Sequence, residues 1–330
     1  MMIIAGDIGG TNSRLGIFSP EKGPGNPLKE NTYPTANFHS AIELIGTFME
    51  QAPYPVDRIC LGVAGPITEG KVIMTNLPWT IREREMTAAL KVKSVRFIND
   101  MLALASALPI LKPSDLLTLQ EGVPETNGPI ALVAAGTGLG EAFLVWDGVG
   151  YRAFPSEGGH ADFAPQSDLE MELMKNLQKK FCHVGYDRVC TGPGIAGIYQ
   201  FLREGGYVEE PEWLASRMKL AQDIAPVIAE VVLNRENHSG LCEKTLEMFI
   251  SVLGAEASNM ALTILATGGM YLGGGIAPKL IPLLSRGGFI ESFCRKGRMS
   301  NLAARIPIHV IMEPKAGLYG AAACCLTDLA

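Results

Sequence analysis

The stretch MMIIAGDIGGTNSRLGIF (residues 1–18) decides the fold class, because two short apolar runs flank a glycine-rich turn. Runs of this kind on either side of a glycine turn predict a β-hairpin. Farther along, residues 59–64 and 95–98 are short apolar runs that predict buried strands, whereas 39–51 and 101–108 have the apolar spacing of helices. Strands and helices therefore alternate, and this alternation predicts an α/β fold.

The opening pattern returns in IALVAAGTGLGEAFLVW (residues 130–146), with Gly136 aligned near Gly6 and Thr137 opposite Asp7. This weak internal repeat predicts two related halves, each presenting a hairpin turn to one cleft. Chance similarity between two glycine-rich turns is the alternative. The pattern pauses at residues 109–113, which predicts a domain boundary there.

The second half of the chain is expected to be richer in helix. Helices are predicted over 168–181, 211–234, 245–265 and 316–329, and strands over 271–275 and 307–312. Residues 257–278 contain no charged side chain and are long enough to cross a membrane, but they include the glycine runs 268–269 and 273–275. Because such runs break helices, this stretch is interpreted as the end of a buried helix, a turn and a buried strand.

Composition excludes several classes of protein. The 330 residues carry a formal net charge of −6, 47% are apolar and 19% are charged, which is typical of a globular chain with a large core. An acidic chain without a Lys/Arg cluster is not expected to bind nucleic acid, because phosphate neutralisation needs a basic surface. The seven cysteines are irregularly spaced and form no CxxC motif, which favours a reducing, cytoplasmic location.

The first candidate site is the turn formed by Gly6, Asp7, Ile8, Gly9, Gly10 and Thr11. Successive backbone N–H groups in such a turn can bind a phosphate, and a carboxylate at the end of a strand can hold hydrated Mg²⁺. No Lys follows, so this is not a P-loop, and a strand rather than a helix follows, so it is not a dinucleotide-binding turn. An ordinary hairpin turn is the alternative. The second turn, at Gly136, Thr137 and Gly138, favours a phosphate site with two sides.

A third glycine cluster, Gly273, Gly274 and Gly275 followed by Ile276, lies between a predicted strand and a helix. Glycines there would let a flat base or a ribose lie against the backbone. Close packing of the strand on the helix is the alternative.

Acidic and histidine side chains form the other candidates. Asn99 and Asp100 end an apolar strand, where a carboxylate could accept the proton of an attacking hydroxyl or simply cap the next helix. Glu157 and His160 flank two glycines, so one loop could turn both toward a small polar ligand such as a sugar. A metal site using His160 and Asp162 is the rival interpretation.

Taken together, these residues resemble the bacterial glucokinase family, the ATP-dependent hexose kinases of the actin-like, ribonuclease-H-like superfamily. The resemblance rests on GDIGGTNSRLGIF, AGPI, MTNLPW, FINDM, AAGTGLG, PSEGGHADFAP, RVCTGPG, LGGGIAPK and GLYGAA, which occur in this order from residue 6 to residue 322. It implies a two-domain α/β fold in which each domain is a mixed sheet flanked by helices, with the active site in the cleft between the domains.

The resemblance also implies the activity and the roles of residues. The expected reaction is phosphorylation of glucose at its 6-hydroxyl by Mg·ATP, the first step of glycolysis. Both glycine turns would bind the ATP phosphates, with Asp7 near Mg²⁺, and residues 273–276 would lie by the adenosine. Asn99, Asp100, Glu157, His160 and Asp187 would bind the sugar, and Asp100 would be the base. The family usually has Glu where this chain has Asp187, so that contact would be longer or made through water.

Further expectations follow from the same resemblance. The domains are expected to comprise residues 1–110 with 315–330, and residues 111–314. Glucose and ATP are the expected partners, with no membrane or nucleic acid, and a homodimer is the family expectation. The chain lacks the CxCGxxGC cluster of zinc-dependent relatives, so no structural zinc is expected. A kinase for mannose or an N-acetylhexosamine, and a non-catalytic sugar sensor, remain alternative functions.

Overall fold

The computed structural model describes residues 2–52, 54–74, 77–234 and 238–327. The chain forms two compact units. Unit 1 comprises Met1–Leu116, Asp147–Pro155 and Met312–Ala330, and unit 2 comprises Leu117–Trp146 and Ser156–Ile311. Residues 147–155 are grouped with the first unit, although β12 (Tyr151–Ser156) pairs with β11 (Leu139–Trp146). The domain boundaries themselves stay a prediction.

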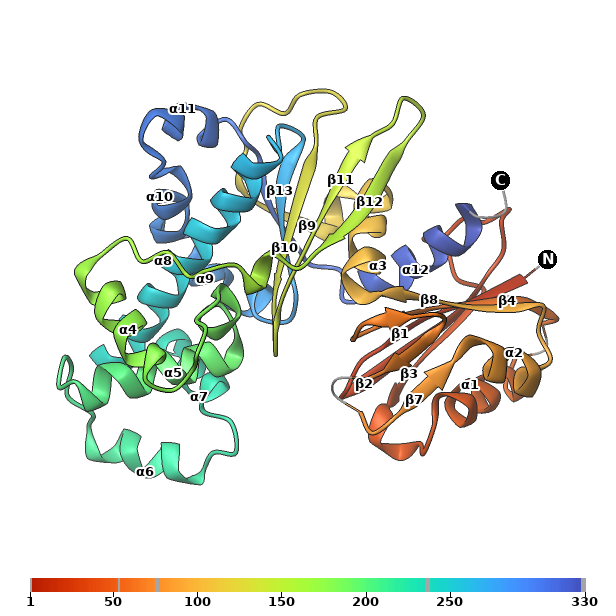
Figure 1. Ribbon diagram of the computed structural model, residues 1–330, viewed down its shortest axis with the longest axis horizontal. Coiled ribbons are helices and arrows are strands. Elements are labelled where there is room, and N and C mark those ends of the chain that lie inside the picture. The colour runs from red at the N-terminus through yellow and green to blue at the C-terminus, as the bar shows by residue number, and fades with distance from the viewer. Residues whose placement is uncertain (1, 53, 75–76, 235–237, 328–330) are drawn as a thin grey trace. The chain divides into compact units, whose positions relative to one another are not determined.

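Unit 1 is built on a five-stranded sheet with the strand order β3-β2-β1-β4-β8 (Figure 1). The predicted hairpin is confirmed, since β1 and β2 pair antiparallel, and β4 and β8 extend the sheet parallel to β1. A small sheet, β5-β6-β7, was not predicted. The strands of this unit are β1 (Met2–Ile8), β2 (Asn12–Phe18), β3 (Lys29–Pro34), β4 (Val56–Val63), β5 (Ile67–Thr68), β6 (Lys71–Ile73), β7 (Thr80–Arg82) and β8 (Ser94–Asn99).

Helices cover both faces of this sheet. They are α1 (Ala41–Glu50), α2 (Glu83–Leu90), α3 (Asp100–Ala107) and α12 (Ala316–Thr327), with short 3₁₀ helices η1 (Thr35–Asn37), η2 (Leu108–Ile110) and η3 (Pro113–Asp115). Side chains alternate along each strand, so Ile4 and Ile59 pack with α1 and α2, whereas Ile3 and Cys60 pack with α3 and α12. Figure 1 shows these two pairs of helices on opposite sides of the sheet. The expectation that the last helix packs back on the first part of the chain is confirmed.

Unit 2 repeats this arrangement. Its sheet contains β11-β10-β13-β14-β9 in that order, with β11 antiparallel to β10 and with β13 and β14 parallel to it. The order of β2-β1-β4-β8 in unit 1 is the same, which confirms the internal repeat. The strands are β9 (Leu116–Gln120), β10 (Ile130–Ala135), β11 (Leu139–Trp146), β13 (Gly269–Gly273) and β14 (Ile308–Ile311); β12 (Tyr151–Ser156) lies mostly in the 147–155 segment.

Four helices of unit 2, α5 (Gly192–Glu204), α7 (Ile224–Asn234), α10 (Gly288–Cys294) and α11 (Ser300–Ala303), contact the long helix α8 (Gly240–Thr263). Residues 257–278 form the end of α8, a turn and β13, as interpreted from the sequence. The others are α4 (Asp168–Gln178), α6 (Glu212–Leu220) and α9 (Ile281–Leu284), with η4 (Gly158–His160), η5 (Tyr186–Arg188), η6 (Ala277–Leu280) and η7 (Gly297–Met299).

One helix prediction is wrong. The continuous stretch 211–234 is divided into α6 and α7, because Ala221 has extended backbone angles and interrupts the helical hydrogen bonds. The carboxylate of Asp223 accepts a hydrogen bond from the backbone N–H of Ala225 at 3.0 Å, which starts the second helix. Apolar periodicity alone does not locate such a break.

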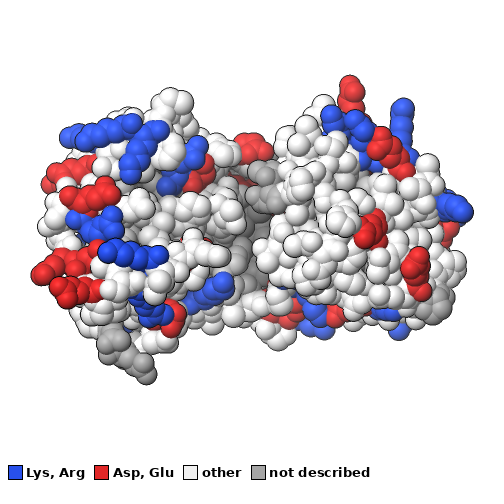
Figure 2. Space-filling view, turned by 90° about the horizontal axis from the view of Figure 1, so that it is seen from below, with Lys and Arg blue, Asp and Glu red and all other residues white. Residues whose placement is uncertain are grey.

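The surface agrees with the composition. On the face drawn in Figure 2, acidic and basic side chains are interspersed, with no broad basic patch of the kind that binds nucleic acid. In the part of the chain that the structure describes, every helix is too short or too polar to cross a membrane.

The packing of α12 on α3 depends on Gly320. A Cβ atom at this position would lie 1.7 Å from the backbone carbonyl oxygen of Ala103, so the two helices would have to separate. We expect Gly320→Ala to lower the free energy of unfolding by about 1–3 kcal/mol, as overpacking does. The matched control is Gly197→Ala in α5, where nothing lies within 4 Å and Ala should stabilise the helix by about 0.5–1 kcal/mol. Urea unfolding of both variants tests this, and equal stability of the two would contradict it.

Candidate active site

The parallel strands of unit 1 bring two predicted site segments to one edge of the sheet. Strands β1, β4 and β8 run in the same direction, so the turn after β1 and the Asn99–Asp100 pair after β8 lie at neighbouring strand ends. Strand β4 lies between them, and its Val63 pairs with Ile8 on one side and with Asn99 on the other. A Cβ at Gly62 would be 3.5 Å from the carbonyl oxygen of Gly6 and 4.0 Å from the Cα of Asp100. The structure therefore brings the first glycine turn and the proposed base close together.

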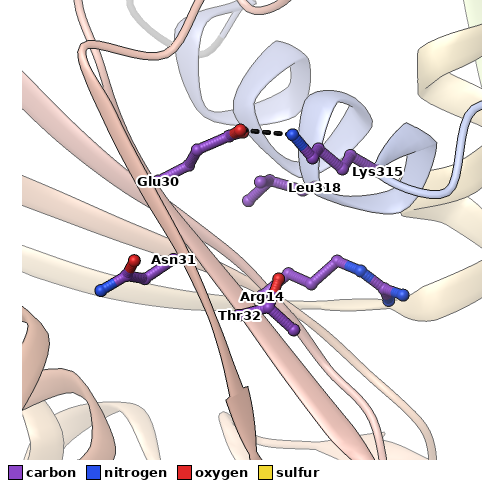
Figure 3. A pocket seen from close by; sticks show the side chains of 6 residues that line it. All are labelled: Arg14, Glu30, Asn31, Thr32, Lys315 and Leu318. Carbon is purple, nitrogen blue, oxygen red and sulfur yellow. Dashed lines mark hydrogen bonds and ion pairs between the residues drawn. The ribbon is translucent and has the colours of Figure 1, made fainter.

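Asp7 lies at this edge with about a quarter of its side chain exposed. Arg14 of β2 is its ion-pair partner, with 3.3 Å between Nη1 and Oδ2. Burial raises the pKa of Asp7, and the charge and hydrogen bond of Arg14 oppose that rise. The first turn of α12 also approaches the carboxylate, since a Cβ at Gly317 would lie 3.3 Å from it. The start of α12 is held by the ion pair of Lys315 with Glu30 of β3. Figure 3 shows this ion pair beside a pocket lined by Arg14, Glu30, Asn31, Thr32, Lys315 and Leu318.

The first glycine turn is braced by a residue that the sequence analysis missed. Thr35 of η1 donates a hydrogen bond through Oγ1 to the carbonyl oxygen of Gly9 at 2.8 Å and contacts the hydroxyl of Ser13, also at 2.8 Å. Its backbone N–H donates to the carbonyl oxygen of Thr11 at 3.0 Å. Gly10 and Thr11 remain exposed, so their backbone is open to a ligand. Thr35 lies 24 residues beyond the turn, and no local pattern indicates its role.

Asn99 and Asp100 divide the capping of α3. The Asn99 side chain is the N-cap and accepts hydrogen bonds from the backbone N–H groups of Met101 and Leu102, at 2.9 and 3.2 Å. Asp100 is the first helical residue, and its Oδ1 accepts from Met101 at 2.9 Å. The capping alternative, which was stated for the carboxylate of Asp100, holds in part: Asp100 bonds to the first turn, whereas the N-cap is Asn99, a role that was not predicted. The amide NH₂ of Asn99 is the group that it can offer to a ligand.

Three glycine-containing segments of unit 2 meet at the carboxyl end of β10. Gly136 accepts a hydrogen bond from the backbone N–H of Gly192, at the start of α5, at 2.9 Å. Gly274 has a left-handed φ of +81°, and a Cβ there would lie 2.3 Å from the carbonyl oxygen of Ala135. The second glycine turn and the proposed adenosine segment therefore adjoin each other. The close contact at Gly274 is with the end of strand β10, whereas the close-packing alternative expected a strand against a helix. Gly192 was not predicted as part of this cluster.

The structure also brings Glu157, His160 and Asp187 together. Nδ1 of His160 lies 3.6 Å from Oδ2 of Asp187, and its Nε2 lies 3.9 Å from Oε2 of Glu157. Asp187 is only 17% exposed, whereas Glu157 is 88% exposed at its side chain. These side chains form a polar cluster that is open to solvent on the Glu157 side.

Backbone contacts fix this cluster. The N–H of Tyr186 donates to the carbonyl oxygen of Ala161 at 3.1 Å, and an isolated β-bridge joins Asp162 to Gly185. The Asp162 carboxylate lies 2.8 Å from Nε2 of His183, so its nearest histidine partner is not the one in the proposed metal site. Within the described residues, no group of three or more His, Cys, Asp and Glu side chains could hold a metal ion.

Comparisons with known proteins identify the family. The family model described as glucokinase matches residues 4–328. The chain belongs to the glucokinase family. A glucokinase from Nostoc punctiforme is 37% identical over 335 residues, which cover 98% of each chain. A crystal structure of glucokinase from an Antarctic psychrotroph superposes with a TM-score of 0.83 at 32% identity and 99% coverage of both chains.

More distant structures share the fold of this glucokinase family member. A ROK family glucokinase from Streptomyces griseus, solved in complex with glucose and AMPPNP, has a TM-score of 0.66 at 18% identity, covering 100% of this chain and 99% of its own. The predicted actin-like ATPase fold, with mixed sheets flanked by helices, is confirmed. The protein is a sugar kinase that phosphorylates glucose with ATP, as predicted, and the sensor alternative is not supported.

The bracing of the first turn can be tested by removing one hydroxyl group. Thr35→Val keeps the shape but leaves the Gly9 carbonyl without its donor, so we expect a loss of about 1–3 kcal/mol in stability and a severalfold higher KM for ATP. Thr47→Val is the control, because its hydroxyl bonds only to the Glu43 carbonyl on the surface of α1. Initial rates at saturating glucose give both constants, and an unchanged KM for ATP in Thr35→Val would contradict the bracing role.

Proposed function

We propose that the chain transfers the γ-phosphoryl group of ATP to the 6-hydroxyl of D-glucose, giving glucose 6-phosphate and ADP, with Asp100 as general base. One observation carries the assignment of Asp100. Its Cα lies beside the β1 turn, separated from it by the side-chain-free position Gly62. A carboxylate at a strand end next to a phosphate-binding turn is placed to take the proton of a hydroxyl that attacks phosphorus.

The nucleotide roles are divided between the two glycine turns. We assign the ATP phosphates to Gly6–Thr11 and to Gly136–Gly138, whose backbone N–H groups can stabilise negative charge. Gly273–Ile276 would lie against the adenosine, since this segment adjoins the second turn at Ala135. The left-handed Gly274 allows that close approach of the backbone.

Mg²⁺ fits the residues at the first turn. Asp7 is a partly exposed carboxylate at the end of its strand, and Mg²⁺ is typically held by one or two carboxylates together with phosphate oxygens and water. When bound, the ion neutralises charge on the transferring phosphoryl group. Asp7 would hold the ion only in its ionised form, and the charge and hydrogen bond of Arg14 favour that form.

The sugar hydroxyls are assigned to Asn99, Asp100, Glu157, His160 and Asp187. Within unit 2, the short distances from His160 to both carboxylates support a single polar site that can match several hydroxyls. The low exposure of Asp187 gives it little freedom to adjust, so its shorter side chain would contact the sugar directly at a longer distance or through water.

Two further assignments concern the setting of the enzyme. All seven cysteines are free thiols in the structure, which supports a reducing compartment, and we propose a cytoplasmic location. A homodimer is proposed from the family resemblance.

The base assignment is tested by Asp100→Asn, which keeps the size of the side chain but cannot accept the proton. We expect kcat to fall by about 10²–10⁴-fold, with the Kd for glucose changed much less. Asp168→Asn is the matched control, because Asp168 is likewise the first residue of its helix. Steady-state rates and calorimetric titration with glucose provide both quantities. Full kcat in Asp100→Asn would rule out the role.

The choice of hexose is tested by comparing kcat/KM for glucose, mannose and N-acetylglucosamine, which differ at carbon 2. Since a site built to hydrogen-bond a hydroxyl rejects an analogue that leaves its polar groups unpaired, we expect glucose to be preferred. A higher kcat/KM for either other sugar would assign the site to that sugar.

A further inference from the structure

Two buried carboxyl groups lie behind the sugar loops and have no part in the roles assigned above. Glu141 of β11 is 1% exposed and Glu256 of α8 is 4% exposed. The two carboxyl groups interact with each other through a side-chain hydrogen bond. Oε1 of Glu141 is buried and has no hydrogen-bond partner within the described residues. Burying two acids together is costly unless one is protonated, so this pair needs a physical explanation.

The surroundings determine which acid carries the proton. Oε2 of Glu256 accepts a hydrogen bond from Nδ2 of Asn259 at 2.9 Å, Tyr186 also bonds to it, and the charge of Lys296 acts on it. These contacts favour the ionised form of Glu256, although burial raises its pKa. Burial raises the pKa of Glu141 to about 8, and the neighbouring charge of Glu256 contributes. At neutral pH, Glu141 is therefore the acid that carries the proton, and it shares that proton with Glu256.

The pair contacts both loops of the sugar site. Oε2 of Glu141 occupies the space beside Gly158, where a Cβ would lie 2.1 Å from it. Tyr186, which binds Asn259 through its hydroxyl at 2.9 Å, immediately precedes Asp187. Burial and the Glu256 charge raise the pKa of Tyr186 to about 12, so it stays neutral. The contact thus reaches from α8 to the loop of Glu157 and His160 and to the loop of Asp187.

We propose that Glu141 is a positioning residue for glucose: it shares one proton with Glu256, and this pair holds the backbone of Gly158–His160 and Tyr186–Arg188 in the sugar-binding arrangement. The proposal rests on the sugar-binding role assigned to those loops. Loss of the shared proton places two negative charges in a buried site. Their repulsion displaces Gly158, which packs on the carboxyl group, and so weakens glucose binding more than the chemical step.

The other titratable groups around the pair do not supply the proton that Glu141 and Glu256 share. Lys296 is hydrogen-bonded to the backbone carbonyl of Ala255 at 3.1 Å and to the side chain of Asn259, and burial lowers its pKa. Cys190 is buried and the nearby carboxylates raise its pKa further, so it stays a thiol. Glu157 and His160 flank Gly158, but their side chains are largely exposed.

The first test is the pH dependence of KM for glucose between about pH 6 and about pH 10, which brackets the pKa of about 8. We expect KM of the wild type to rise above pH 8, by up to about tenfold per pH unit, with a smaller change in kcat at saturating glucose. Glu141→Gln keeps a donor to Glu256 but cannot ionise, so its KM should stay flat. Glu256→Gln removes the neighbouring charge and should move the transition to lower pH. Glu247→Gln, an exposed position on α8, should retain the wild-type profile.

A second readout does not depend on sugar. The folded state binds the proton more tightly than the unfolded chain, in which the pKa is near 4.5, so wild-type stability falls as pH rises from about 4.5 to about 8 and is then constant with respect to this group. The Tm of Glu141→Gln relative to wild type should rise over that range. Hydrogen exchange of peptides covering 156–163 and 183–190, corrected for intrinsic rates, should accelerate above pH 8 in wild type but not in Glu141→Gln.

These outcomes separate the two proposals. If the wild type shows no pH transition in KM, hydrogen exchange or relative Tm, or if Glu141→Gln shows the same transitions, the shared proton and its positioning role are overturned. If exchange and Tm follow the expected transition but KM for glucose does not, positioning for glucose is overturned, and Glu157→Gln and Asp187→Asn then show whether these loops bind sugar at all. Coincident transitions in all three measurements support the proposal.

Discussion

The arrangement of unit 1 depends on glycines that let backbone segments approach each other closely. Gly320 lets α12 pack on α3, and α3 begins at Asp100. Gly317, one turn earlier in α12, lies against the carboxylate of Asp7. The position of one helix therefore affects the surroundings of both acids assigned to catalysis. A side chain at either glycine would change the site without replacing any residue that binds substrate.

The two units use the same strand arrangement for related purposes. In both, an antiparallel hairpin precedes two parallel strands, so its turn lies beside their carboxyl ends. Both units place glycines at this edge, at Gly9 and Gly10 in unit 1 and at Gly136 and Gly274 in unit 2, and unit 1 also places the acidic Asp7 and Asp100 there. A carboxylate can hold a metal or accept a proton, and exposed backbone can bind phosphate or a flat base. The repeat thus provides one geometry that the two halves fill with different chemistry.

Much of this could be predicted from the sequence, because its signals are local. The two hairpins, the buried strands and the glycine turns are each specified by neighbouring residues. The break between α6 and α7 and the small β5-β6-β7 sheet were missed, since both depend on a few weakly marked positions. Thr35 was missed for another reason: its hydroxyl reaches Gly9 only after the chain has folded through β2 and β3.

The sequence contains a signal for the two buried acids that the prediction of the site did not use. Glu141 lies in the apolar run LGEAFLVW, and Glu256 is the one charged residue of GAEASNMALT. Each is therefore an acid where the pattern requires an apolar side chain. One such residue in isolation predicts only a local irregularity. Two acids on separate elements, buried with the same neighbours, predict a shared proton, because two charges there would be too costly. Pairing them required the fold, which places β11 and α8 behind the same loops. In the proposed arrangement the strand ends carry the phosphoryl chemistry, while the irregular loops assigned to the sugar obtain their order from polar contacts beneath them.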